Sequence, residues 1–229
     1  QGGKDSASER YIFTQLSTIT RYIFPQEDDA ILNYLDDDGF PVEPIYYAPI
    51  IPMVLVNGSK GIGTGFSTEI LPYYPPQIIH YLKQKLLKQH NDNTVFTPYY
   101  EGFTGSILKV SDTKYLVCGK YEVIGTDKIR VTELPIGYWT DDFKEHLETL
   151  ASNTDKNGKK VTPIIKDIDD MSKSINVNIV ITFARDKLYD LEHKTVDNGC
   201  NNLEKTLKLY TTYSTTNMHM FDAQEKLKK

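Results

Sequence analysis

Four prolines, at positions 41, 44, 49 and 52, constrain the fold of this chain more than any other local feature. A proline lacks a backbone N–H, so it interrupts a helix and leaves a central strand one hydrogen bond short. The stretch 41–52 is therefore predicted to be extended and to lie outside the centre of any sheet. A short apolar strand at 53–56 and an Asn57-Gly58 turn are predicted to follow it.

The next segment, residues 58–65, contains four glycines. The dinucleotide-binding pattern Gly-x-Gly-x-x-Gly does not occur there in full, and a phosphate-binding loop needs Gly-Lys-Ser/Thr, whereas Lys60 precedes Gly61. The segment instead predicts a tight, exposed hairpin that pushes Ile62 outward. An exposed apolar wedge of this kind can enter a DNA base step. The alternative is that Ile62 packs beneath a neighbouring element.

The remaining patterns predict an α+β fold, with a helical N-terminal piece followed by a mixed β-sheet and packed helices. The prediction places a β-meander at 104–134, whose strands run over 104–110, 115–121 and 128–134. Strict alternation over 175–183 predicts a half-buried strand. Predicted helices cover 11–24, a short stretch from Asp28 or Asp29 towards Asp37, a run that opens at Pro75, a run that Thr140 caps, and about 185–193.

Charge and composition limit the function classes. The 229 residues carry 26 basic and 31 acidic side chains, a net charge of −5, which argues against a free-standing nucleic-acid-binding domain. The two cysteines and five histidines show no metal-site spacing. No apolar run reaches membrane-spanning length, so no membrane partner is expected. Because the chain starts at Gln1 within an apparent motif, we expect a fragment of a longer protein.

Tyr11 follows Arg10 directly, and this pair suggests chemistry on a phosphodiester. A tyrosine hydroxyl is a weak nucleophile until a base, a metal or a cation assists it. The guanidinium of Arg10 could stabilise charge that develops on phosphorus. The alternative is a half-buried packing tyrosine with a hydrated hydroxyl.

Two long segments resemble the eukaryotic type IIA DNA topoisomerases. The first is Gly-Gly-Lys-Asp-Ser-Ala-Ser-Glu-Arg-Tyr-Ile-Phe-Thr at 2–14, which is similar to the active-site tyrosine region of that family. The second, at 42–67, includes Pro-Met-Val-Leu-Val-Asn-Gly-Ser-Lys-Gly-Ile-Gly-Thr-Gly-Phe-Ser and occurs in the expected order and separation. Residues 99–139 resemble the family more loosely.

The resemblance implies roles for individual residues. Tyr11 matches the nucleophile that forms a 5′-phosphotyrosine link, and Arg10 matches its transition-state partner. Ile62 matches the isoleucine that intercalates and bends the duplex. The implied DNA-binding residues are Lys4, Ser8, Lys60 and Ile62.

The chain departs from the family at two places near these residues. Glu9 stands where relatives often have proline, and Phe66 stands where they usually have tryptophan. Neither position carries the chemistry, although Glu9 adds a negative charge beside a phosphate-handling site.

The resemblance also implies that the chain is part of a longer, multidomain enzyme. The full-length enzyme would be a nuclear homodimer that uses ATP and Mg²⁺ to pass one DNA duplex through another. Residues 1–52 would be the C-terminal part of a winged-helix domain, and 53–229 a tower domain. The fragment itself is expected to bind neither cofactor and to be inactive alone. The alternative function is a structural DNA-bending module in which Tyr11 only packs.

Overall fold

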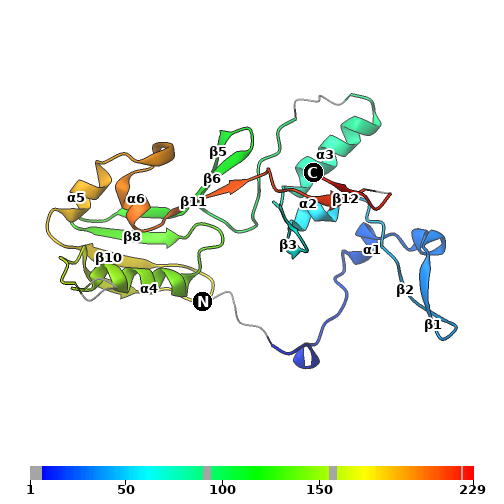
Figure 1. Ribbon diagram of the computed structural model, residues 1–229, viewed down its shortest axis with the longest axis horizontal. Helices are drawn as coiled ribbons and strands as arrows, with labels where there is room; N and C mark the ends of the chain where they lie inside the picture. Colours follow the sequence, from blue (N-terminus) through cyan, green and yellow to red (C-terminus); the bar gives the residue numbers. More distant parts are fainter. Residues whose placement is uncertain (1–6, 90–93, 155–158, 223) are drawn as a thin grey trace. The chain divides into compact units, whose positions relative to one another are not determined.

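The computed structural model describes residues 7–89, 94–154, 159–222 and 224–229 (Figure 1). The chain divides into two compact units. Among the described residues, one comprises Glu101–Thr216, and the other combines residues 7–100 with Asn217–Lys229. The mixture of helices and strands confirms the predicted α+β class, but the predicted mixed sheet is wrong, because every strand pair in the described residues is antiparallel. The predicted boundary between residues 52 and 53 stays a prediction.

The unit at 101–216 is built on two antiparallel sheets. A four-stranded sheet has the order β7-β8-β10-β9, and a three-stranded sheet has the order β11-β6-β5. The elements of this unit are β5 (Ser106–Ser111), β6 (Lys114–Cys118), β7 (Lys120–Val123), β8 (Lys128–Glu133), α4 (Thr140–Ala151), β9 (Ile165–Asp170), β10 (Ile179–Phe183), α5 (Lys187–Glu192), η3 (Asp197–Gly199), α6 (Asn202–Thr206) and β11 (Tyr210–Ser214).

Period-2 alternation explains where the core of this unit lies. Val131 on β8 pairs with Ile179 on β10, and Ile129 pairs with Ile181, so all four apolar side chains share one face of the sheet. Helix α4 lies along this sheet in Figure 1 and contributes Phe143 to the same core. The buried cluster comprises Ile129, Val131, Leu134, Phe143, Leu147, Ile165, Ile179, Ile181, Phe183, Leu188, Leu203, Leu207 and Leu209.

The predicted meander at 104–134 is wrong in its connectivity. Gly119 divides the middle strand into β6 and β7, which belong to different sheets. A Cβ at Gly119 would lie 2.4 Å from the carbonyl oxygen of Glu133, so only glycine permits this close approach. The Gly119 N–H also donates to the carbonyl of Leu209, next to β11. Glycine thus lets the chain cross from one sheet to the other.

Two further predictions in this unit need correction. The strand expected at 175–183 begins only at Ile179, because Lys173 and Asn176 form a tight turn and Ile175 is 92% exposed. Thr140 is the first residue of α4 rather than its cap. The N-cap position is Trp139, and no side chain caps the helix.

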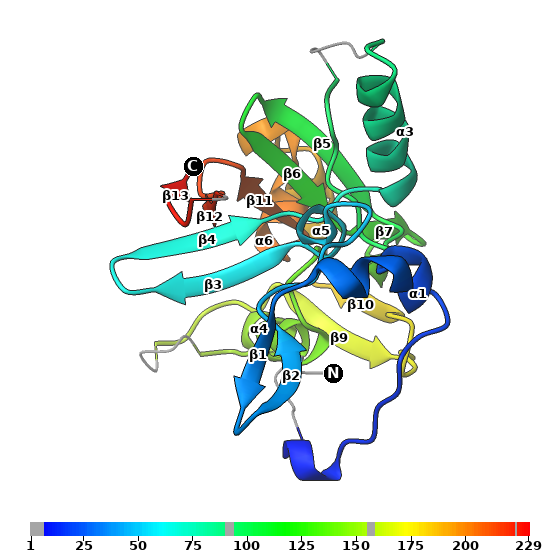
Figure 2. The ribbon, with the colours of Figure 1, turned by 90° about the vertical axis from the view of Figure 1, so that its right-hand side faces the viewer.

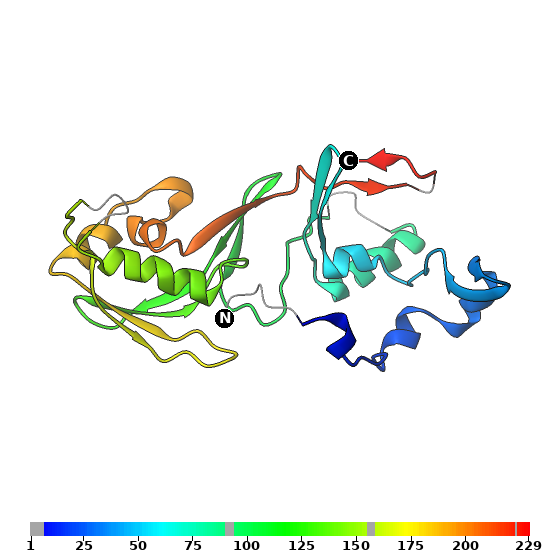
Figure 3. The same cartoon turned by 60° about the horizontal axis from the view of Figure 1, so that its bottom comes forward.

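The second unit contains three small antiparallel ribbons and several short helices, seen from two directions in Figures 2 and 3. The longest helix begins at Pro75, as predicted, and carries Lys83 and Lys85 in its last turn. The elements are η1 (Glu9–Tyr11), α1 (Thr20–Ile23), η2 (Gln26–Ile31), β1 (Tyr34–Asp37), β2 (Phe40–Pro44), α2 (Met53–Asn57), β3 (Ser59–Gly63), β4 (Phe66–Ile70), α3 (Pro75–Leu86), β12 (Met220–Phe221) and β13 (Leu227–Lys228).

The helix predicted over 11–24 is wrong. Only η1 and α1 are helical there, and Ile12, Leu16 and Ile19 of the apolar pattern are exposed. Helical periodicity stabilises a helix only where its apolar face is covered. Only its C-terminal end is partly covered, where Phe24 packs against Tyr47 and the Ile50 N–H donates to the Ile23 carbonyl, so the helical structure stays short.

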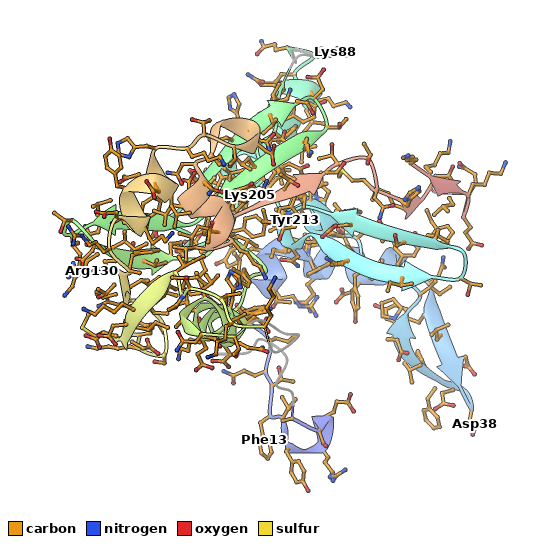
Figure 4. The ribbon with its side chains drawn as sticks, turned by 60° about the vertical axis from the view of Figure 1, so that its left-hand side comes forward. Phe13, Asp38, Lys88, Arg130, Lys205 and Tyr213 are labelled. Atoms are coloured by element: carbon orange, nitrogen blue, oxygen red, sulfur yellow. The ribbon has the colours of Figure 1, made fainter. Side chains whose placement is uncertain are left out.

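The segment after α1 also differs from the prediction. The short helix expected from Asp28 or Asp29 ends at Ile31 as 3₁₀ turns, and β1 and β2 then form a hairpin around Asp38, which Figure 4 labels. Both strands are largely exposed, as suits the proline-containing β2. The predicted strand at 53–56 is instead α2. Gly58 ends α2 with a φ of +68°, the positive value that glycine tolerates best.

No helix in the described part of the chain is long and apolar enough to cross a membrane.

One ion pair of the first unit allows a pH prediction. Lys144 on α4 lies 2.6 Å from the carboxylate of Asp170 on β9, and the Ser172 N–H donates to the same carboxylate. These contacts, the lysine first, lower the pKa of Asp170 to about 2. A depressed carboxyl pKa stabilises the fold above the unfolded pKa of about 4, and this contribution is lost as the pH falls towards 2.

We therefore expect Asp170→Asn to lower the free energy of unfolding at pH 7 by about 1 kcal/mol, since both side chains are partly exposed. The difference from wild type should shrink below about pH 4. Urea unfolding from pH 7 to pH 3 measures it. The control Asp112→Asn removes the exposed Lys109–Asp112 pair and should change little at any pH. A difference that stays constant with pH would contradict this account.

Candidate functional site

The glycine-rich segment forms the predicted hairpin. Strands β3 and β4 pair from Ser59↔Ile70 to Gly63↔Phe66, and Gly65 turns the chain with a φ of +85°. Ile62 lies beside this turn and is 94% exposed. The alternative that Ile62 packs beneath a neighbouring element is therefore wrong. Its role as a DNA wedge remains a prediction.

Lys60 and Ile62 share one face of the hairpin, because residues two apart on a strand point to the same side. The ammonium of Lys60 lies 2.9 Å from the carboxylate of Glu69, its cross-strand neighbour. Two candidate DNA-contacting residues thus share one surface, and an acidic side chain partly neutralises the cation.

On the opposite face of the hairpin, the aromatic ring of Phe66 packs against the backbone. A Cβ placed at Gly63 would lie 2.8 Å from the ring of Phe66, so the ring packs directly over the glycine backbone. At the base of β4, Ile70 is buried at 5% exposure. The hairpin is therefore anchored at its base and thin at its tip.

A segment far along the chain pairs with the outer edge of β4. The Glu69 N–H donates to the carbonyl of Asn217 at 2.8 Å. The Thr68 hydroxyl donates to the carbonyl of His219 at 2.8 Å, and the His219 N–H donates back to that hydroxyl at 2.9 Å. The amide of Asn217 donates to the hydroxyl of Ser67 at 2.9 Å. Figures 2 and 3 both show β12, which follows this segment, beside β4.

The free energy of these hydrogen bonds is large enough to affect the stability of the hairpin. An isolated two-stranded hairpin is marginally stable in water. Each of the four added hydrogen bonds contributes about 0.5–1.5 kcal/mol, so together they supply roughly 2–6 kcal/mol. Unstacking one base step costs about a few kcal/mol, which is of the same order.

Tyr11 and Arg10 lie on η1, a single turn that the Tyr11 N–H closes by donating to the Ser8 carbonyl at 2.9 Å. The guanidinium carbon of Arg10 lies 4.7 Å from the centre of the Tyr11 ring. A cation over an aromatic face is favourable. Tyr11 is 68% exposed, so the alternative of a half-buried packing residue is wrong. Its neighbour Phe13, labelled in Figure 4, is also almost fully exposed.

Ser8 and Lys4 are the remaining predicted DNA-binding residues. Ser8 is exposed and occupies the N-cap position of η1, but its side chain makes no capping hydrogen bond. Lys4 lies outside the described residues.

The described residues fit neither Mg²⁺ nor ATP, the two cofactors that the resemblance implies. Within those residues, no group of three or more histidine, cysteine, aspartate or glutamate side chains could hold a metal ion. The glycine segment is an antiparallel hairpin, whereas a phosphate-binding loop leads from a strand into a helix. No step through Mg²⁺ or ATP is therefore assigned to these residues.

Sequence reasoning missed the residues that hold the hairpin: Thr68, Asn217 and His219. Thr68 and His219 are 151 positions apart, and neither stands in a motif. The pairing is made by backbone groups and small polar side chains, which leave no periodic signal. Only the tertiary structure reveals it.

Comparison with known proteins decides the family. A model of the DNA gyrase/topoisomerase IV family, describing its A-type subunit, matches residues 1–229. This chain belongs to that family. It is 40% identical over its whole length to DNA topoisomerase 2 of Arabidopsis thaliana and of Drosophila melanogaster, of which it covers 15% each. The family assignment confirms the resemblance found in the sequence.

A solved structure agrees with the sequence comparison. The Plasmodium falciparum topoisomerase II DNA-binding, cleavage and re-ligation domain superimposes with a TM-score of 0.86 at 39% identity. The match covers all of this chain and 29% of that one. Because the chain spans only 15% of the length of the two curated relatives, the activity of the whole protein is a matter for proposal.

The exposure of Ile62 gives a stability prediction. We expect Ile62→Ala to change the free energy of unfolding by less than about 0.5 kcal/mol, because the side chain is in water. The matched control Ile70→Ala should cost about 2–5 kcal/mol, because Ile70 is buried. Chemical denaturation measures both. A large loss for Ile62→Ala would mean that Ile62 has a packing role.

Proposed function

We propose that this chain is the DNA-bending and DNA-cleaving segment of a type II DNA topoisomerase. The observation that carries the proposal is Ile62, an almost fully exposed isoleucine at the tip of an anchored hairpin. Because its side chain lies in water, Ile62 would gain free energy on entering an apolar site on a binding partner. A base step of double-stranded DNA is such a partner.

In this proposal Tyr11 is the nucleophile. Its deprotonated phenolic oxygen attacks a backbone phosphorus, the bond from phosphorus to the 3′ oxygen breaks, and the departing 3′ oxygen takes up a proton. The new phosphotyrosine ester retains the free energy of the broken bond, so the reverse attack by the 3′ hydroxyl reseals the strand. The guanidinium of Arg10 lies beside the Tyr11 ring and can offset negative charge on the phosphate.

The wider assignments belong to the same proposal. Residues 1–52 are the end of a winged-helix domain, and 53–229 form a tower domain. The whole enzyme is a nuclear homodimer that uses Mg²⁺ and ATP, whose sites are supplied by other parts of the protein. Because the net charge here is −5, we infer that much of the basic DNA-binding surface also lies elsewhere.

Tyr11→Phe in the full-length enzyme tests the chemistry. We expect covalent protein–DNA adducts to disappear, because phenylalanine has no nucleophilic oxygen, while DNA affinity stays nearly unchanged. Denaturing gel analysis of trapped cleavage complexes measures the adducts. The control Tyr22→Phe alters another exposed tyrosine of the same unit and should leave the adducts intact. Adducts that persist in Tyr11→Phe would favour the purely structural DNA-bending module.

Glu69→Gln tests the DNA-facing side of the hairpin. The substitution removes the negative charge beside Lys60 and so strengthens its attraction to a phosphate; the slope of log affinity against log salt concentration should therefore steepen by up to about 0.9. Fluorescence anisotropy of the full-length enzyme at several salt concentrations measures the slope. The gain should vanish in the double variant Glu69→Gln/Lys60→Gln. An unchanged slope in Glu69→Gln would place Lys60 away from the DNA.

A further inference from the structure

The β3–β4 hairpin is supported along one edge. Within the described residues, β3 and β4 form a two-stranded sheet, and Ile62 lies near its tip. The outer edge of β4 is covered by residues 217–219, which we call the brace. The brace makes four hydrogen bonds, which involve the three consecutive β4 residues Ser67, Thr68 and Glu69.

The position of these bonds relative to Ile62 is informative. Ser67 is the direct cross-strand partner of Ile62, and it accepts a hydrogen bond from the Asn217 amide. Thr68 comes next and makes a reciprocal pair of hydrogen bonds with the backbone of His219. The brace therefore holds β4 directly opposite the wedge residue, not only at the buried base of the hairpin.

The face of β4 opposite Ile62 is also packed near this point. The His219 ring lies beside the Phe66 ring, with centroids 6.4 Å apart, and Phe66 in turn covers Gly63. The Nδ1 atom of His219 is buried and, among the described residues, makes no hydrogen bond. The imidazole is thus held against the hairpin by packing and by its own backbone.

We propose that the brace positions Ile62 for DNA bending, with Thr68 as its central positioning residue. A wedge opens a base step only if the hairpin that carries it resists being pushed back. A free two-stranded ribbon would fray or tilt under that load. The brace supports the outer edge of β4, so the opposing force is carried by a segment 151 residues away in the chain. This inference rests on the proposed function of Ile62.

The test is DNA bending by the full-length enzyme, measured by energy transfer between dyes at the two ends of a short duplex. We expect Thr68→Val, which keeps the side-chain shape but removes the hydroxyl, to shift the bent-to-unbent ratio by about ten-fold towards unbent DNA. Thr68→Ser keeps the hydroxyl and should restore bending to within about two-fold of wild type. The fold-decrease in DNA affinity should be no larger than the fold-decrease in the bent-to-unbent ratio.

Asn217→Ala provides a second variant in case Thr68→Val folds poorly, which thermal unfolding would reveal. It removes one exposed hydrogen bond and should reduce the bent-to-unbent ratio by about three-fold. Ile62→Ala is the reference for complete loss of bending.

The outcomes separate the two proposals. If Ile62→Ala abolishes bending while folded Thr68→Val and Asn217→Ala bend DNA like wild type, the brace has no positioning role and the proposed function stands. If Ile62→Ala itself bends DNA like wild type, the proposed function of Ile62 fails and the inference fails with it. Loss in Thr68→Val with recovery in Thr68→Ser supports the brace.

Discussion

The reciprocal hydrogen bonds between Thr68 and His219 are the contact on which the exposed hairpin depends. An edge strand presents unpaired backbone groups to water, and a ribbon of two strands has little stability of its own. Hydrogen bonds from residues 217–219 cover part of that edge without adding bulk at the tip. The hairpin can then be both thin, so that Ile62 projects into solvent, and firm, so that the projection is maintained.

The two units illustrate different ways in which apolar residues are used. In the unit at 101–216, alternating residues of β8 and β10 meet α4 and form one buried cluster. In the other unit, apolar side chains around η1 and α1 remain exposed, and regular structure there is short. Burial rather than periodicity therefore decides which apolar patterns become long elements.

The candidate site was largely readable from sequence because its chemistry is local. Arg10 and Tyr11 are adjacent, and Ile62 is framed by glycines that can neither bury it nor shield it. The helix at 140–151 and the strand at 179–183 were also readable, since their periodicity reflects a real core. Met53–Asn57 was misread because a short apolar run fits a strand and a buried helix turn equally well.

The sequence by itself determined the α+β class, the exposed glycine hairpin, the tyrosine with its neighbouring arginine, and the family. Each of these follows from residues close together in the chain. Only the tertiary structure decided that Gly119 passes the chain between two sheets, that the meander is split, and that residues 217–219 hold β4. Such contacts join residues far apart in the chain, 151 positions in the case of Thr68 and His219. They use backbone groups and small polar side chains, which are common throughout the chain, so no periodic pattern marks them in the sequence.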